Sequence, residues 1–274
     1  MRHYISLSIL LFASAVALAG TEVPGWGGPI ANDKGIEALG WLAGIGSQPD
    51  NYLLLFAAAS PARPTATKEV VTSDGYVNLV RNGRSIGVAS QFTVRAYTDS
   101  IPAASTGSAT TPANGTASVD IAVGSLDAAP NYISNPTGGV QLSPVAVHLE
   151  ACTARALASP GKPVQLVTGC TGRSNYISSR GVKVADIPAT ADNMVVRIPE
   201  DTTEPPIAFV FVNERITTDI HGNPTTDENG RYKFDPTATS GYVNIARIAS
   251  IDDSFDVLTL GHAAVVRDPA MTDK

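Results

Sequence analysis

The chain has 274 residues, of which 43% are hydrophobic and 16% are charged, and its formal net charge is −6. This hydrophobic content excludes a disordered chain, and 24 glycines with 19 prolines fit neither collagen nor a low-complexity linker. The acidic balance argues against binding to a nucleic-acid backbone, so no nucleic-acid partner is expected. Few charges on a chain rich in Ser, Thr and Ala are typical of an extracellular β protein.

The first 19 residues have the pattern of a secretory signal peptide. A short basic start at Arg2 precedes an apolar run from Ile5 to Leu18, and Ala17-Leu18-Ala19 forms a small-residue cleavage site. The apolar run is shorter than the ~20 residues that a membrane-spanning helix needs, which favours cleavage after Ala19 over an uncleaved anchor. We therefore expect a secreted or cell-surface protein whose mature chain begins at Gly20 and does not span a membrane.

Residues 20–67 are predicted to form a less regular N-terminal segment. Gly35 to Gly46 and Asn51 to Ser60 are interpreted as short helices, although their glycines weaken that interpretation. Trp26 and Trp41 also lie in this segment. Exposed tryptophans stack on sugar rings, whereas lone tryptophans of secreted domains more often lie in the core or under a lid. Both residues are therefore candidate ligand-stacking residues, with a core position as the alternative.

Residues 68–274 are predicted to form one all-β domain, an antiparallel β-sandwich. Gln91 to Tyr97 alternate between polar and apolar residues, as expected of a half-buried strand. Ile207 to Val212 are apolar throughout, which is typical of a strand buried on both faces. Asn82-Gly83 is a strong hairpin signal because both residues tolerate positive φ. Proline and glycine recur between such runs, as in sandwiches with short turns.

Two stretches are predicted to be long loops. Thr98 to Ser118 is rich in small and polar residues and contains Asn114, an N-glycosylation acceptor only in a eukaryotic secretory pathway. Thr217 to Thr239 is dense in turn-forming residues. Its stretch from Asp219 to Asp235 lacks the ligand spacing of a calcium-binding loop. A hydrated turn is therefore favoured there over a cation site.

Cys152 and Cys170 are the two cysteines of the chain, and in an oxidising compartment they are expected to form a disulfide. Two free thiols are the alternative, and a metal site is disfavoured because the histidines lack ligand spacing. A turn signal from Pro160 to Pro163 predicts a hairpin that the disulfide would pin in register. Simple alternation from Val145 to Ala151 would place Cys152 on the opposite face from Leu149.

The sequence contains none of the common catalytic signatures. The nucleophile elbow, the zinc-binding H-E-x-x-H, the P-loop and the dinucleotide-binding fingerprint are all missing. The carboxylates of Asp252, Asp253 and Asp256 are interpreted as a hydrated turn rather than as a glycosidase pair. We therefore expect no enzymatic activity, no cofactor and no metal, while an exported enzyme with an unrecognised site remains an alternative.

A series of short motifs follows the second half of the chain. In order they are His148 to Ala154, Gly181 to Val184, Asn193 to Pro199, Phe211 to Arg215, Ser240 to Ile248 and Leu260 to Ala263. This series resembles the choice-of-anchor P family of bacterial secreted and surface proteins, over roughly residues 75–266. Members of that family show a Cys-bearing strand, an L-N-E-Q-like step, a V-N-A-L-H-like strand and a final G-x-A strand.

The motifs depart from the family at two places. Arg215 stands where Gln is common, and Ala246-Arg247 stand where Leu-His is common. The family's usual C-terminal anchor is not found. The resemblance implies an extracellular β-rich module with no assigned enzymatic role, and it supplies no catalytic residues.

These observations predict a structural or adhesive protein of a cell surface or extracellular matrix. Its expected partners are other surface or matrix proteins, or polysaccharide. The alternative is an extracellular carbohydrate- or ligand-binding module.

Overall fold

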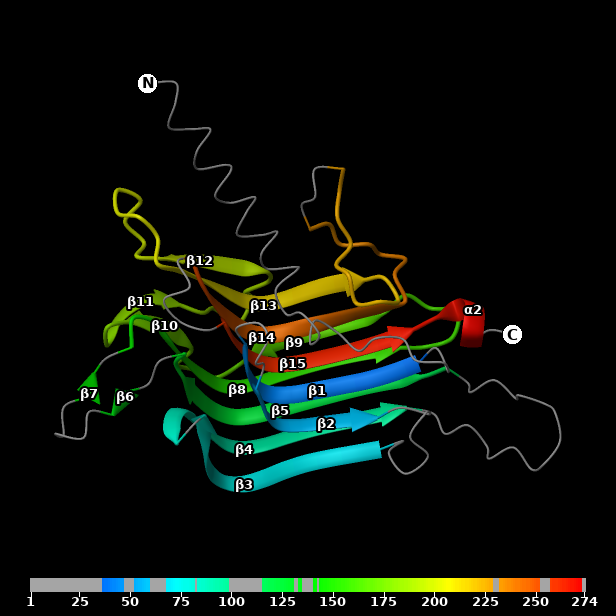
Figure 1. Ribbon diagram of the computed structural model, residues 1–274, viewed down its shortest axis with the longest axis horizontal. Coiled ribbons are helices and arrows are strands. Elements are labelled where there is room, and N and C mark those ends of the chain that lie inside the picture. Colours follow the sequence, from blue (N-terminus) through cyan, green and yellow to red (C-terminus); the bar gives the residue numbers. More distant parts are fainter. Residues whose placement is uncertain are drawn as a thin grey trace.

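Two antiparallel β-sheets pack face to face in the computed structural model of the chain (Figure 1). The structure describes residues 36–46, 52–59, 68–81, 83–98, 115–130, 133–134, 140–141, 143–228, 232–251 and 257–272. Within these ranges the only helix is the four-residue α2 (Pro269–Thr272). The predicted all-β sandwich is therefore confirmed.

Sheet A has six strands in the order β12-β13-β14-β15-β1-β2. Its strands are β12 (Met194–Ile198), β13 (Ala208–Thr218), β14 (Ser240–Ser250), β15 (Val257–Arg267), β1 (Ile36–Gly46) and β2 (Tyr52–Ala59). As predicted for the apolar run that begins at Ile207, β13 lies between two neighbouring strands and most of its side chains are buried.

Sheet B has seven strands in the order β11-β10-β8-β5-β4-β3, and β9 pairs with β8 beside this series. Its strands are β3 (Lys68–Arg81), β4 (Arg84–Thr98), β5 (Ala117–Ala128), β8 (Ala146–Ala158), β9 (Gln165–Cys170), β10 (Tyr176–Ser179) and β11 (Val182–Asp186). The predicted hairpin at Gly83 joins β3 to β4, where Arg81 pairs with Arg84. The short strands β6 (Ile133–Ser134) and β7 (Val140–Gln141) form a separate two-stranded sheet.

The prediction of two short helices before residue 61 was wrong, because both segments are strands of sheet A. β1 lies in the interior of the sheet, between β15 and β2, and most of its residues are buried. A strand buried on both faces has no polar alternation, so its sequence is easily taken for a helix. A Cβ at Gly40 would lie 2.5 Å from Val119 Cγ1, so glycine allows the two sheets to approach there. The sandwich thus extends to Ile36 rather than beginning at residue 68.

In β5 and β8 of sheet B, buried side chains alternate with more exposed ones except at one level, where the step between buried residues is three. In β8, Leu149 and Cys152 are successive buried residues, and Ala151 between them has a φ of 49°. The non-terminal strand residues with positive φ are Leu55, Asn213 and Gly261 in sheet A, and Gln91 and Ala151 in sheet B. The pairing register does not change across these residues, so no extra residue is inserted. The positive φ itself exchanges the inward and outward faces of the strand beyond that level.

Within the described ranges, no helix is long and apolar enough to cross a bilayer. β4 ends at Thr98 and β5 begins at Ala117, and residues 99–114 of the loop predicted between them lie outside the described residues. The predicted signal peptide, Trp26, Asn114 and the Asp252–Asp256 cluster lie outside the described residues.

Candidate functional site

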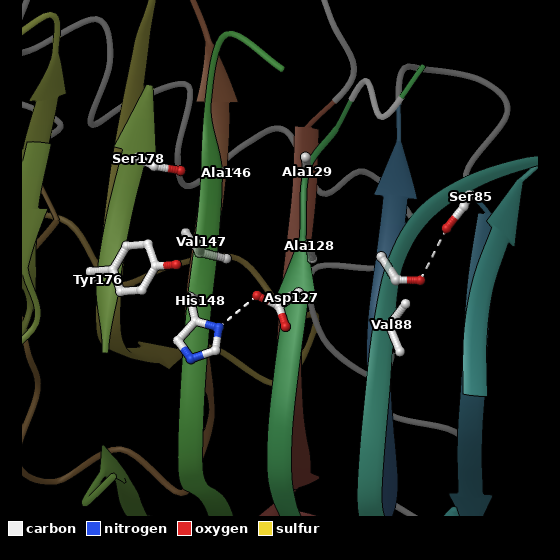
Figure 2. A pocket seen from close by; sticks show the side chains of 11 residues that line it. Ser85, Val88, Asp127, Ala128, Ala129, Ala146, Val147, His148, Tyr176 and Ser178 are labelled. Atoms are coloured by element: carbon white, nitrogen blue, oxygen red, sulfur yellow. Dashed lines mark hydrogen bonds and ion pairs between the residues drawn. The ribbon is translucent and has the colours of Figure 1, made fainter. Parts of the chain in front are cut away.

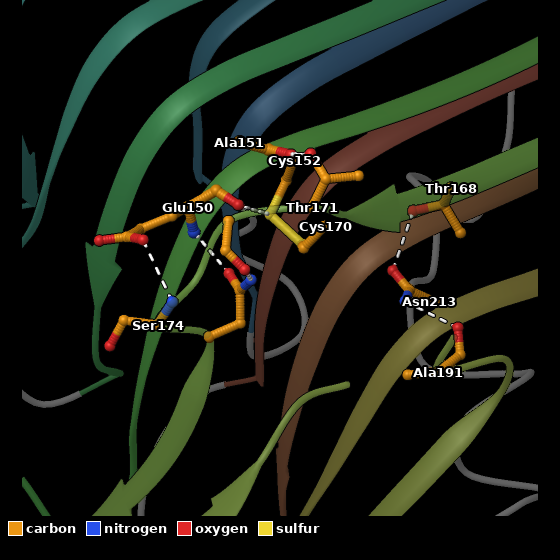
Figure 3. The surroundings of a disulfide bond; sticks show 11 residues. Glu150, Ala151, Cys152, Thr168, Cys170, Thr171, Ser174, Ala191 and Asn213 are labelled. Carbon is orange, nitrogen blue, oxygen red and sulfur yellow. Dashed lines mark hydrogen bonds between the residues drawn. A yellow bond between two sulfur atoms is a disulfide. The ribbon is translucent and has the colours of Figure 1, made fainter. Parts of the chain in front are cut away.

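The predicted disulfide between Cys152 and Cys170 is present and joins paired residues of β8 and β9 (Figure 3). Their Cα atoms are 4.0 Å apart, slightly below the usual range of about 4.4–6.8 Å. The pair lies at the open end of the β8–β9 hairpin, as predicted. The predicted face was wrong, because the positive φ of Ala151 turns Cys152 inward, onto the same buried face as Leu149.

The chain after Cys170 continues in the same direction along β8 and is hydrogen-bonded to Glu150 (Figure 3). The backbone amide of Glu150 donates to Asn175 Oδ1 at 2.6 Å, and the amide of Ser174 donates to Glu150 Oε2 at 3.2 Å. The side chain of Asn175, which is 4% exposed, donates to the Gly172 carbonyl at 2.9 Å. The disulfide and Glu150 therefore fix where β10 begins, and with it the position of Tyr176.

A pocket of about 300 Å³ lies across β4, β5, β8 and β10 of sheet B (Figure 2). Its residues are Ser85, Gly87, Val88, Asp127, Ala128, Ala129, Ala146, Val147, His148, Tyr176 and Ser178. Figure 2 shows His148 and Asp127 side by side, with Tyr176 on the neighbouring strand. The pocket thus combines small apolar residues with a histidine, a carboxylate, a phenol and serine hydroxyls.

His148 is held between two carboxylates and an aromatic ring, and we refer to His148, Asp127, Glu150 and Tyr176 as the His148 cluster. Its Nδ1 lies 2.6 Å from Asp127 Oδ1, and its Nε2 lies 3.3 Å from Glu150 Oε1. Its ring stacks on Tyr176 with 5.0 Å between ring centroids.

The two carboxylates favour a charged imidazolium at His148. Partial burial lowers the pKa of His148, but hydrogen bonds and negative charge from Asp127 and Glu150 outweigh burial and raise that pKa above its usual value. In return, the hydrogen bond from His148 lowers the pKa of Glu150. Near neutral pH the imidazolium therefore offsets part of the negative charge of the cluster.

Sheet A carries a second group of polar side chains, a row formed by Glu214, Asn244, His262 and Trp41, with Arg247 beside it. In the row, Glu214 pairs with Asn244, Asn244 with His262 and His262 with Trp41 across four neighbouring strands. All five residues are at most 6% exposed. We call this group the buried polar row.

Hydrogen bonds connect the buried polar row. Arg247 donates to both carboxylate oxygens of Glu214, at 2.6 and 2.9 Å, and Asn244 Nδ2 donates to Glu214 Oε2 at 2.7 Å. The side-chain oxygen of Asn244, Oδ1, lies 2.7 Å from His262 Nδ1. Because this oxygen can only accept, neutral His262 carries its proton on Nδ1. Burial lowers the pKa of His262 to about 3, so this ring is neutral at physiological pH.

Trp41 is 1% exposed and stacks on His262 with 3.8 Å between ring centroids. It is therefore a core residue, and the predicted role as an exposed stacking residue does not fit its position. The alternative core position proposed from the sequence describes it correctly.

In the turn predicted around Asp219, the aspartate carboxylates accept hydrogen bonds from nearby residues. Asp219 accepts from the backbone amides of His221 and Asn223, and Asp235 accepts from Thr237. No group of three metal-ligating side chains occurs in the described part of the chain. The local hydrogen bonds of Asp219 and Asp235 agree with the predicted turn.

Sequence reasoning missed the pocket. It placed His148 and Glu150 on one face of a strand, and they do share the outward face of β8. Asp127 and Tyr176 come from β5 and β10, and their pairing with His148 depends on strand register. The alternation of His148 and Glu150 was the one signal in the sequence.

No protein-family model matches the chain, and comparison with curated proteins and with solved structures finds no match.

Proposed function

We propose that this chain is an exported structural or adhesive β-sandwich module of a cell surface or extracellular matrix, without catalytic activity. The observation that carries the proposal is the Cys152–Cys170 disulfide, which is buried in the core between paired strands. Disulfides persist in oxidising compartments, and a signal peptide ending at Ala19 would deliver the chain to one. The resemblance to the choice-of-anchor P family supports the same role.

The dimensions of the sandwich also suit a structural role. β3, β4 and β8 have 14, 15 and 13 residues, whereas strands of about 5–6 residues are typical. Long antiparallel ladders combine many backbone hydrogen bonds with a continuous core, and the disulfide fixes one of them in register.

Fractionation of cells that produce the full chain tests export. The expected product lies in the extracellular or surface fraction, begins at Gly20 and contains no free thiol. Protein that still begins at Met1, or that carries two free cysteine thiols, would contradict export.

Comparison of producing cells with cells lacking the chain tests the adhesive role. Loss of the chain should reduce attachment or matrix cohesion, and supplying the full chain should restore it. Unchanged attachment and cohesion would contradict this role while leaving export intact.

A second candidate function, extracellular ligand binding, is favoured by the pocket of sheet B. The pocket joins an ion-paired histidine, an aromatic ring and several hydroxyl groups over an apolar surface. Such a combination is typical of small-molecule sites.

A further inference from the structure

We infer that the pocket of sheet B binds one neutral sugar ring, a single pyranose unit, with Tyr176 and Asp127 as its principal contacts. This inference rests on the ligand-binding role proposed above and names its ligand class. Size, unpartnered polar groups and charge each contribute to the assignment.

The size of the pocket fits one ring. Its volume of about 300 Å³ is at the lower end of the range for small-molecule sites, about 300–1,000 Å³. Small residues, among them Gly87, Ala128 and Ala146, line it. A Cβ at Gly87 would lie 2.2 Å from the backbone oxygen of Asp127, so glycine is required for this close approach of β4 to β5.

Three polar atoms of the pocket, one carboxylate oxygen and two hydroxyl oxygens, have no hydrogen-bond partner among the described residues. Asp127 uses Oδ1 to contact His148, which leaves Oδ2 available, and the hydroxyls of Tyr176 and Ser178 make no side-chain hydrogen bond there. Figure 2 shows both hydroxyls directed from β10 toward β8. A carboxylate oxygen accepts, whereas hydroxyls donate and accept. This mixture suits a ligand whose own groups do both, as sugar hydroxyls do.

The charge of the pocket favours a neutral ligand. The carboxylate of Asp127 is paired with His148, whose raised pKa keeps the imidazolium populated near neutral pH. Among the residues that line the pocket, the carboxylate of Asp127 and the imidazolium of His148 balance each other, so neither a cation nor an anion would find an uncompensated counter-charge there. The apolar C–H face of a pyranose packs on aromatic rings. Since one face of the Tyr176 ring stacks on His148, the other face would make this contact.

Saturation-transfer NMR on the full chain tests the inference. The probes are D-glucose, D-galactose, D-mannose and N-acetyl-D-glucosamine, with acetate and tetramethylammonium as charged probes without a ring. At least one pyranose should receive saturation, with a dissociation constant on the order of 1 mM for so small a ligand. The charged probes should receive none.

Variants locate the binding. Tyr176→Ala removes the ring and should weaken the pyranose by about tenfold or more, whereas Tyr176→Phe keeps the ring and should weaken it less. Asp127→Asn should also weaken binding, because it removes the charged acceptor and the ion pair. Tyr76→Ala is the matched control, since Tyr76 is 82% exposed on the edge strand β3 and does not line the pocket.

The possible outcomes distinguish sugar binding from ligand binding in general and from the structural or adhesive role. If no pyranose binds, or if binding survives both Tyr176→Ala and Asp127→Asn, the sugar assignment is overturned. If a charged probe binds instead and is lost in Tyr176→Ala, the pocket is a ligand site of another class. If no probe binds at all, the inference fails and the structural or adhesive role is unaffected.

Discussion

The two sheets each hold a histidine in a polar cluster, yet the two histidines carry different charges. His262 in the buried polar row is fully buried and contacts the neutral amide of Asn244, and burial lowers its pKa to about 3. His148 in sheet B keeps a side-chain exposure of 20% and contacts two carboxylates, which raise its pKa. Water access and the charge of the partner, rather than the residue type, therefore decide whether the imidazole is charged.

This difference reverses the pH dependence that each histidine gives to stability. Between about pH 3 and pH 6.5, unfolding lets His262 take up a proton that the folded state excludes, so its contribution is lost as pH falls. His148 holds its proton more tightly when folded. Its contribution is complete below the unfolded pKa, about 6.5, and is lost as pH rises through the raised folded pKa.

The largest effect is expected from breaking the ion pair of the buried polar row. Glu214→Gln removes the carboxylate charge that pairs with the guanidinium of Arg247, which is 3% exposed. Removing one partner of a buried pair costs about 3–5 kcal/mol. Urea unfolding at neutral pH measures the loss.

The control for Glu214→Gln is Asp120→Asn, which removes one partner of a half-exposed pair. Arg155 and Asp120 are 3.3 Å apart with side-chain exposures of 53% and 44%. Such surface pairs contribute about 0–1 kcal/mol. Equal losses of unfolding free energy in the two variants would contradict the expectation that the buried ion pair of sheet A contributes more to stability than the half-exposed pair of sheet B.

The next effect belongs to sheet B and its disulfide. Replacing Cys152 and Cys170 together by Ser should lower the free energy of unfolding by about 2–4 kcal/mol, because the unfolded chain gains freedom. The fold should persist, since the hairpin is also held by its strand pairing. Chemical unfolding with circular dichroism measures both, and a loss below about 0.5 kcal/mol would contradict a stabilising disulfide.

The fold class and the disulfide could be predicted because they depend on local signals. Alternation at Gln91 to Tyr97 and an even cysteine pair in an exported chain do not require knowledge of distant contacts. β1 could not be recognised, because a strand buried on both faces loses its polar alternation. The face of Cys152 was missed because a non-glycine residue, Ala151, adopts positive φ.

The pocket depends on information that the sequence does not display. Asp127 and His148 are 21 residues apart and meet because β5 and β8 pair in one register. A shift of one residue would turn either side chain to the other face. Sequence pattern shows which strands exist, while the register that joins their polar residues arises from packing of the whole sheet.

A third prediction isolates the buried histidine. Between pH 7 and pH 5, the wild-type chain should lose about 2 kcal/mol more unfolding free energy than His262→Gln, whose amide does not titrate. Urea unfolding of both proteins at the two pH values measures the difference. If the two proteins lose stability in parallel, His262 does not stay neutral in the folded state.

The smallest effect is expected at His148, and it has the opposite sign. His148→Gln removes the imidazolium that Asp127 and Glu150 share, so the variant should be less stable than wild type near pH 5.5, by about 1 kcal/mol or less for so accessible a cluster. The deficit should shrink as pH rises, because wild-type His148 then loses its proton too. His221→Gln is the control, because His221 lies in the exposed turn after β13, outside both clusters. A His148→Gln deficit that grows with rising pH would mean that the cluster holds a neutral imidazole, and the contrast between the two sheets would then be lost.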